Sequence, residues 1–208
     1  MQFLKFIVAG FQSAGAVMQW AILLCLFAGL ALVLERVWFL FFKCGMGSSS
    51  FMSGIGKYLK AGDYAKAIQY ASSINTPLAK GVTAILQNRG KGAKAIQKKV
   101  DEVFLSEAPK VQRNLGLLAV VANVATLCGL TGTIYGLMQA FDAIANVPAA
   151  QRAAALANGI SFAMSTTLFG LTTAVPLIFL HGILSRKSQK IVEEMDEKTV
   201  KMINLVEE

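Results

Sequence analysis

Charged residues are absent from two long stretches of this sequence. Residues 115–141 and 153–185 contain no Asp, Glu, Lys or Arg, and only the segment 142–152 separates them. A run of about twenty apolar residues is long enough to cross a bilayer as a helix. The two stretches therefore predict a transmembrane hairpin, with spans over 115–141 and 153–185 and a short turn over 142–152.

Residues that carry catalytic chemistry are scarce as well. The chain has three Cys, at positions 25, 44 and 128, and a single His, with no CxxC or His-rich pattern. No phosphate-binding glycine loop, metal-ligand cluster or nucleophile–base set is visible, so the sequence predicts no enzyme activity, no cofactor and no metal site. Only 15% of the residues are charged, against about 25% in soluble domains, and 55% are hydrophobic. This composition indicates an integral membrane protein.

A third apolar stretch covers residues 14–42, near the N-terminus. It is uncharged as far as Leu34, and Glu35 and Arg36 then form an adjacent pair that can reach toward the membrane interface. Residues 1–13 hold one charge and several aromatic residues, and they predict an amphipathic helix at the membrane surface. The predicted fold is all-α with three transmembrane helices. The second and third exceed the thickness of a bilayer and are expected to extend into the cytoplasm.

Basic residues are distributed unevenly along the chain. Of the 20 Lys and Arg residues, 12 lie in residues 43–113 and 5 in the tail 186–201. Because basic residues concentrate on the cytoplasmic side of membrane proteins, both segments are predicted to be cytoplasmic, and the N-terminus and the 142–152 turn are predicted to face outward. Topology accounts for the net charge of +8, and no motif for nucleic acid is present.

Short helices are predicted in the cytoplasmic residues 43–114. Ser and Gly residues within 48–56 indicate a linker. Asp63 is a candidate cap for the helix that follows it, and Pro77 opens another helix, which ends at the break 89–92.

Two longer helical patterns follow. One helix face over residues 93–105 carries Ile96, Val100, Val103 and Phe104. From Ala108 the pattern runs without interruption into the second span. The C-terminal segment 186–208 predicts a bundle-forming helix, because apolar or small side chains recur at alternating spacings of four and three residues: Val192, Met195, Thr199, Met202 and Val206.

A stripe of small residues follows one face of the second span. Two interpretations are open: small side chains let neighbouring helices pack closely, and threonine hydroxyls can line a pore and bind water or a titrating group. The stripe consists of Thr126, Gly129, Thr133, Gly136 and Ala140. The third span repeats the pattern with Ser161, Ser165, Thr166, Thr167, Thr172 and Thr173. Pro176 removes a backbone donor there and predicts a kink.

The interiors of the second and third spans contain no carboxylate, Lys or Arg, although an ion pathway normally requires a charged or titratable group at membrane depth. If the chain conducts ions, a partner must supply this group. Asp142, at the outer end of the second span, and His181, near the cytoplasmic end of the third, are candidates for proton entry and exit. Both residue types are also ordinary at a helix end near an interface.

Two segments resemble the signatures of the MotA/TolQ/ExbB proton-channel family. Residues 129–141, GLTGTIYGLMQAF, resemble the family pattern GLLGTVxGMxxAF. Residues 159–176, GISFAMSTTLFGLTTAVP, resemble GIxxALxTTxxGLxxAIP. Three spans, a short outer turn and a large cytoplasmic part are similar to the ExbB/TolQ branch, whereas MotA has four spans.

The resemblance implies a channel or stator subunit of a motor driven by an ion gradient. It also implies a location in the bacterial inner membrane, with the N-terminus and the 142–152 turn periplasmic and the C-terminus cytoplasmic. It implies a homo-pentamer around a dimer of a single-span ExbD/TolR-like protein, whose membrane Asp carries the proton. It also implies work in the periplasm or at the outer membrane, through a TonB/TolA-like or other periplasm-spanning effector, in an assembly surrounded by membrane lipids. By motif position Thr133 and Thr167 line the ion path, and Thr166, Thr126 and Ser165 are expected along it. A helix-packing role is predicted from the residue types themselves, small side chains and a proline, for Gly129, Gly132, Gly136, Gly170 and Pro176.

Three departures from the family pattern favour a divergent branch. Phe162 stands where many ExbB-like proteins have Glu, Thr126 where Pro is frequent, and His181-Gly182 where a Tyr-Asn pair follows the proline. Phe162 motivates an alternative hypothesis, a non-conducting structural scaffold with the same fold. A third, half of a secondary transporter, requires an internal repeat, and none is clear in the sequence.

Overall fold

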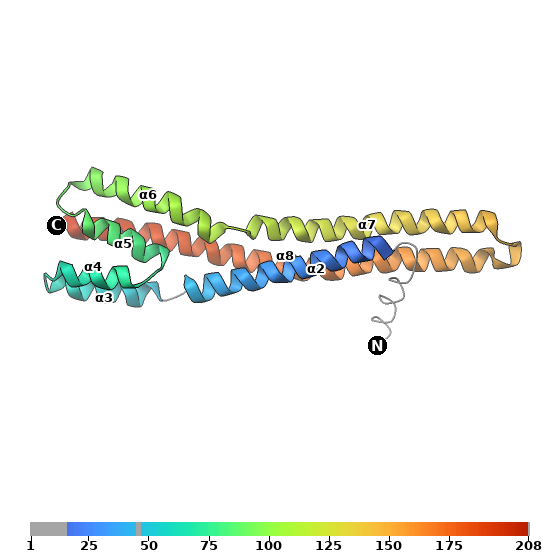
Figure 1. Ribbon diagram of the computed structural model, residues 1–208, viewed down its shortest axis with the longest axis horizontal. Coiled ribbons are helices and arrows are strands. Elements are labelled where there is room, and N and C mark those ends of the chain that lie inside the picture. The colour runs from blue at the N-terminus through green and yellow to red at the C-terminus, as the bar shows by residue number, and fades with distance from the viewer. Residues whose placement is uncertain (1–15, 45–46, 208) are drawn as a thin grey trace. The chain divides into compact units, whose positions relative to one another are not determined.

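The computed structural model describes residues 16–44 and 47–207, in which the regular structure is entirely helical. The predicted interfacial helix over residues 1–13 lies outside these ranges. The elements, shown in Figure 1, are α2 (Ala16–Val37), the π-helix η1 (Trp38–Lys43), α3 (Ser48–Lys60), α4 (Tyr64–Ser73), α5 (Pro77–Gln87), α6 (Ala93–Gln112), α7 (Leu115–Asn146) and α8 (Ala149–Glu207).

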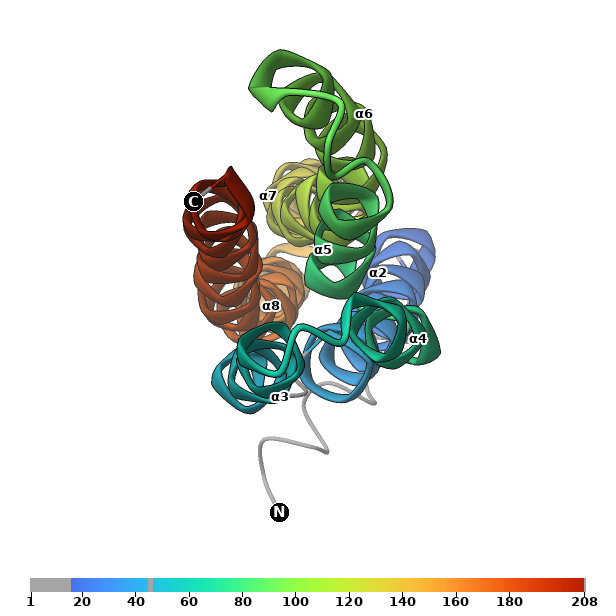
Figure 2. The ribbon, with the colours of Figure 1, turned by 90° about the vertical axis from the view of Figure 1, so that its left-hand side faces the viewer.

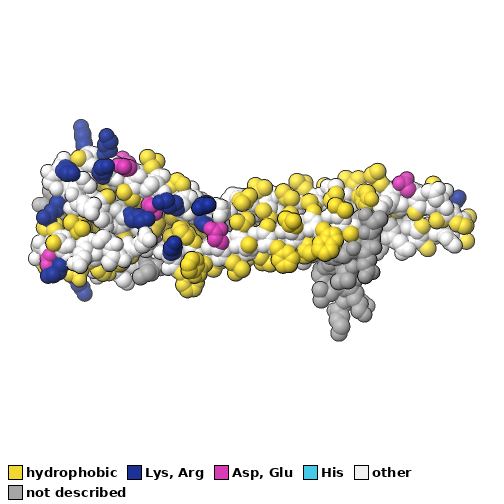
Figure 3. Space-filling view, in the orientation of Figure 1, with side chains coloured by type: hydrophobic (Ala, Val, Ile, Leu, Met, Phe, Trp, Pro, Cys, Tyr) yellow, Lys and Arg dark blue, Asp and Glu magenta, His cyan; other side chains and the backbone are white. Residues whose placement is uncertain are grey.

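The chain divides into two compact units. We call the described residues 16–34 and 116–182 the apolar unit, and residues 35–115 and 183–207 the polar unit. Figure 3 shows hydrophobic side chains gathered over α2 and α7 in the apolar unit, and many Lys and Arg side chains over the polar unit.

Within the part of the chain that the structure describes, three helices are long and apolar enough to cross a membrane, as the sequence predicts. In each of them, no more than 33% of the most apolar window is buried within the chain. A large apolar surface is therefore left for lipid or for other subunits. The opposite charges that follow the first apolar run form an ion pair, in which Arg36 Nη2 lies 2.7 Å from Glu35 Oε1.

Small residues set the packing of α7 against α8, which run side by side in opposite directions (Figure 1). A Cβ added at Gly129 would lie 3.2 Å from the carbonyl oxygen of Thr166, and one added at Gly159 would lie 2.3 Å from Ala140 Cβ. On α2, a Cβ at Gly29 would lie 2.5 Å from Leu177 Cδ1 of α8. The three helices of the apolar unit therefore approach closely where side chains are smallest.

The connection between α7 and α8 is shorter than predicted. α7 continues to Asn146 and α8 begins at Ala149, so only Val147 and Pro148 link them, and the turn predicted over 142–152 is wrong in extent. The prediction placed the boundaries at charged residues, but the alanine-rich flanks favour helix whether or not charge is present. Pro148 lacks an N–H, which favours a break in the helix there.

Two predictions for other parts of the chain were also wrong. α6 ends at Gln112 and α7 begins at Leu115, because Asn114 has a φ of 60°, outside the helical region; the pattern is therefore not continuous between them. The predicted linker over residues 48–56 is helical and forms most of α3. Tertiary packing overrides the low helix propensity of its Gly and Ser residues there.

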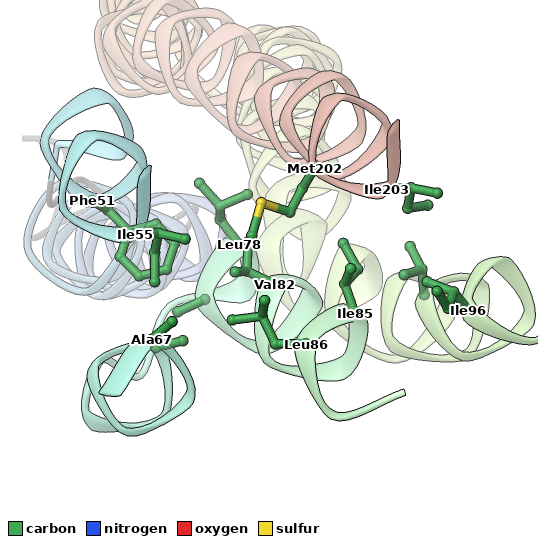
Figure 4. Packing of buried hydrophobic residues seen from close by; sticks show 13 residues of the cluster. Phe51, Ile55, Ala67, Leu78, Val82, Ile85, Leu86, Ile96, Met202 and Ile203 are labelled. Atoms are coloured by element: carbon green, nitrogen blue, oxygen red, sulfur yellow. The ribbon is translucent and has the colours of Figure 1, made fainter. Parts of the chain in front are cut away.

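A hydrophobic core joins the helices of the polar unit. α5 lies next to α4 and α6 (Figure 2), and its residues Leu78, Val82 and Ile85 form the middle of the buried cluster. α3 contributes Phe51 and Ile55, and α8 contributes Met202 and Ile203 (Figure 4). The predicted helices after Asp63, from Pro77 and from Ala93 are confirmed, as is helix formation in the C-terminal segment. α8 is helical through Pro176, and the kink stays a prediction.

The cap of α5 gives a direct test of this core. Thr76 is buried, and its Oγ1 accepts a hydrogen bond from the backbone N–H of Ala79 at 3.3 Å. Thr76→Ala is expected to lower the free energy of unfolding of the polar unit by about 1 kcal/mol, because a helix N–H loses its partner. Thermal unfolding in detergent measures the loss, and Thr76→Ser, which keeps the hydroxyl, should restore most of it. Equal stability of the Ala and Ser variants would contradict this role.

The cap of α4 makes a pH-dependent contribution. The side chain and backbone N–H of Lys66 both bond to the Asp63 carboxylate and lower the pKa of Asp63 below its ordinary value. A carboxylate with a lowered pKa stabilises the fold above its unfolded pKa of about 3.9, and this contribution is lost as pH falls through the folded value. The difference in melting temperature between the wild type and Asp63→Asn should therefore shrink from about pH 6 to about pH 3, because Asn caps without titrating. A difference that stays constant would argue against the carboxylate.

Candidate functional site

An open groove in the apolar unit is the candidate functional site. Its volume is about 820 Å³, and one of its lining residues, Thr133, comes from α7 while all others come from α8. The lining residues are Thr133, Ala157, Ile160, Ser161, Met164, Thr167, Leu168 and Leu171. None of these carries a titratable group, so hydroxyls are the polar side-chain groups of the groove.

The two threonines of the groove differ in their hydrogen bonds. Thr167 Oγ1 donates across the helix pair to the carbonyl oxygen of Gly129 on α7, at 3.1 Å. Thr133 Oγ1 donates within α7 to the carbonyl oxygen of Leu130, at 2.6 Å. Since a hydroxyl that donates its proton keeps lone pairs, each oxygen can still accept a hydrogen bond from water or from a protonated acid. The groove can therefore solvate a proton carrier but cannot itself hold the proton.

The close approach of the helices makes the bond from Thr167 possible. A Cβ added at Gly129 would lie 3.3 Å from the Cα atoms of both Thr167 and Gly170. Gly129 thus brings its own carbonyl within reach of a short side chain on α8.

The other hydroxyl residues predicted for an ion path do not line this groove. Ser165 and Thr166 are buried within the chain, and their hydroxyls donate to the carbonyl oxygens of Phe162 and Ala163 at 2.8 Å. Thr126 is half-buried and donates to Ala122 at 3.3 Å. The structure therefore brings Thr133 and Thr167 together and leaves these three elsewhere in the same helix pair.

The residues expected at the ends of a proton path lie outside the groove. Asp142 is exposed in the last turns of α7, where its carbonyl oxygen accepts a bond from Asn146. His181 is half-buried in α8, near the boundary of the apolar unit at Gly182. Neither contributes to the lining, and their roles stay predictions.

Phe162 stands where the resemblance leads us to expect Glu. Its ring packs on α7, because a Cβ added at Gly136 would lie 2.9 Å from Phe162 Cδ1. The departure thus places an apolar ring at the helix contact in place of a carboxylate.

Gln19 is a residue that the sequence predictions missed. It is completely buried in α2, and neither atom of its side-chain amide has a hydrogen-bond partner among the residues the structure describes. An unpaired buried amide costs about 1–3 kcal/mol, so this position marks an unusual polar group within the apolar unit. The sequence does contain a sign of this residue, because Gln19 is the one side-chain amide in the uncharged residues 14–34.

Comparison with known proteins identifies the class. The chain belongs to the MotA/TolQ/ExbB proton channel family, whose model matches residues 71–197, more than half of the chain. With its three long apolar helices, this membership indicates an inner-membrane protein.

Relatives from three organisms support the ExbB/TolQ branch. A biopolymer transport protein exbB1 of Vibrio cholerae is 24% identical over 93% of this chain and 86% of its own length. An ExbB homolog of Methanothermobacter thermautotrophicus is 24% identical over 81% of this chain. The TolQ protein of the Tol-Pal system of Pseudomonas aeruginosa is 33% identical over 41% of this chain. The chain spans 59% of the length of the Methanothermobacter relative and 37% of TolQ.

Proposed function

We propose that this chain is the channel subunit of an inner-membrane motor driven by an ion gradient. In this proposal its groove faces a partner that carries the proton. The observation that carries the proposal is the groove in which Thr133 and Thr167 meet without any titratable neighbour. Such a surface can pass hydrogen bonds to a moving acid but needs that acid from elsewhere. An ExbD/TolR-like protein with one span and a membrane Asp is the proposed source.

The proposed assembly is a homo-pentamer around a dimer of this partner. The large exposed apolar surface supports it, because each membrane helix leaves most of its surface for lipid or for neighbouring subunits. In this arrangement the grooves of the subunits face inward, and the partner Asp visits each in turn. Asp142 is proposed at the entry and His181 at the exit of the path.

The proposed topology places the polar unit and the C-terminus in the cytoplasm and the link at Val147–Pro148 in the periplasm. The concentration of basic residues in 43–113 and 186–201 supports this orientation. α7 and α8, with 32 and 59 residues, exceed the roughly 20 residues that a bilayer requires, and we propose that the cytoplasmic end takes up the excess. Work would then be delivered on the opposite side through a periplasm-spanning effector.

A structural scaffold is the second candidate, and Phe162 favours it. The apolar ring packs at a position where the resemblance leads us to expect an acid, so this chain lacks one charged group of the expected pattern. A scaffold predicts a stable homo-oligomer that holds no acidic single-span partner. The two candidates therefore differ in what the purified assembly contains.

Native mass spectrometry of the assembly separates the two candidates. The chain would be extracted in mild detergent from the membrane in which it is naturally expressed. We expect a ring of about five copies that retains two copies of a small protein with one membrane-spanning Asp or Glu. A homo-oligomer that never retains such a protein would contradict the motor and favour the scaffold.

A further inference from the structure

A small cavity in the polar unit gathers three lysines around one buried carboxylate. Its volume is about 130 Å³, and its wall includes Lys43 of η1, Lys80 of α5, and Glu107 and Lys110 of α6. The ring of Phe39 also lines it. These residues come from three helical segments that are far apart in sequence, and burial of a carboxylate among them is costly unless it is paired.

The charges of this cavity do not cancel. Lys80 Nζ lies 3.1 Å and Lys110 Nζ 2.6 Å from the same oxygen, Glu107 Oε1. Glu107 is 6% exposed, and it is the only acid in the lining. Lys43 forms no ion pair among the residues that the structure describes; its ammonium lies 5.9 Å from the centroid of the Phe39 ring. Three lysines and a single acid therefore line the cavity, so its lining carries a net positive charge that favours the binding of an anion.

Arg36 reinforces the positive potential beside the cavity. Its Nη1 donates to the carbonyl oxygen of Lys110 at 3.3 Å, and its guanidinium lies 4.9 Å from the centroid of Phe39. The side chain is 3% exposed, and its Nε is buried without a hydrogen-bond partner in the described residues. Because Glu35 balances the charge of Arg36, the unbalanced charge of the cluster belongs to the lysines.

The sequence places two of these lysines close to the ends of the predicted membrane spans. Lys43 follows Leu34, the last residue of the first uncharged run, by nine residues, and Lys110 precedes Leu115, the first residue of the second, by five. Basic residues that flank a span in this way are positioned to meet anionic headgroups. Trp38 and Phe42 on η1 are 62% and 69% exposed, as expected of aromatic residues at a membrane interface.

We propose that this cavity binds the phosphate of an anionic membrane lipid on the cytoplasmic side. Ammonium groups bind phosphate oxygens through charge-assisted hydrogen bonds, and basic pockets beside membrane spans bind anionic headgroups. The volume suits a phosphate group with a few waters and is below the roughly 300 Å³ of pockets that hold larger ligands such as nucleotides. The exposed aromatic residues beside it would lie against the acyl chains, which favours a lipid over free phosphate.

Lipid binding by the full chain tests the proposal without any partner protein or ion flow. The protein would be titrated in detergent with phosphatidylglycerol, and bound lipids would be counted by native mass spectrometry. Lys43→Gln/Lys80→Gln should weaken the tightest binding about tenfold or more, because two ammonium groups are lost. The matched control Lys57→Gln/Lys98→Gln removes the same charge from exposed positions of the same unit and should change it less than about twofold.

Two further measurements complete the test. Glu107→Gln should tighten lipid binding, because it removes the carboxylate that competes for the ammonium groups; this gain cannot arise from misfolding. Phosphatidylglycerol vesicles should raise the melting temperature of the wild type more than phosphatidylcholine vesicles do, and inorganic phosphate at matched ionic strength should not. Equal loss of lipid in the cavity variant and its control would overturn the proposal. If inorganic phosphate raised the melting temperature as much as phosphatidylglycerol does, the cavity would be a site for a soluble anion, and the lipid proposal would be overturned.

Discussion

Thr167→Val is expected to lower proton flux through the assembled complex by about tenfold. Valine has nearly the shape of threonine, so the helix contact survives, but the hydroxyl that donates to the carbonyl oxygen of Gly129 is lost. The lost oxygen is also the acceptor proposed for the partner acid as it enters the groove. Thr133→Val removes the second hydroxyl, and the double variant should fall further than either single one.

Hydroxyls outside the groove provide matched controls. Thr131 and Thr172 are exposed on α7 and α8, and each donates only to its own helix, to Leu127 at 2.8 Å and to Leu168 at 2.7 Å. Thr131→Val and Thr172→Val remove the same atoms and should leave flux within about twofold of the wild type. Thr167→Ser should recover most of the flux. If all four valine variants behaved alike, the groove would have no special part in conduction.

Gly170→Ala is expected to destabilise the apolar unit by about 1–3 kcal/mol and to reduce recovery of the intact oligomer. The added Cβ would lie 2.8 Å from the carbonyl oxygen of Ala125 and 3.1 Å from the Cα of Gly129. Both are backbone atoms, which cannot rotate away as a side chain can. Relief of the clash would therefore separate α7 from α8 and lengthen the hydrogen bond from Thr167.

Gly182→Ala makes the same chemical change in the same helix. No atom lies within 4 Å of a Cβ at Gly182, so the substitution should be neutral or stabilise α8 by up to about 1 kcal/mol through helix propensity. Thermal unfolding in detergent, followed with size-exclusion chromatography, compares the two variants. Equal melting temperatures would show that the close approach at Gly170 is not required for stability.

The membrane spans were predictable from sequence because each apolar residue of a long uncharged run adds to the hydropathy of the whole segment. Long uncharged runs cross a bilayer whatever their neighbours are, and all three predicted helices are present. The ends of the helices were less predictable. Asp142 is charged but remains inside α7, since an exposed charge near a helix end costs little. Asn114 breaks the α6–α7 pattern by a local backbone conformation that hydropathy does not encode.

The candidate site was predictable in part. The family motifs single out Thr133 and Thr167, and the structure brings both into one groove. Their spacing does not reveal that Thr167 bonds across to Gly129 whereas Thr166 turns inward, because neighbouring positions on a helix differ by about 100° in direction. Gln19 and the lysines around Glu107 depend on contacts between distant segments, which no local pattern contains.

The central claim is that this chain conducts protons only with an acid supplied by a partner. The most direct test is proton flux into liposomes that contain the chain together with its single-span partner, driven by a membrane potential. We expect flux with the wild-type partner, and none when the partner's membrane Asp is changed to Asn or when the chain is reconstituted alone. Flux of equal size from the chain alone would contradict the account, because the groove of this chain contains no titratable group.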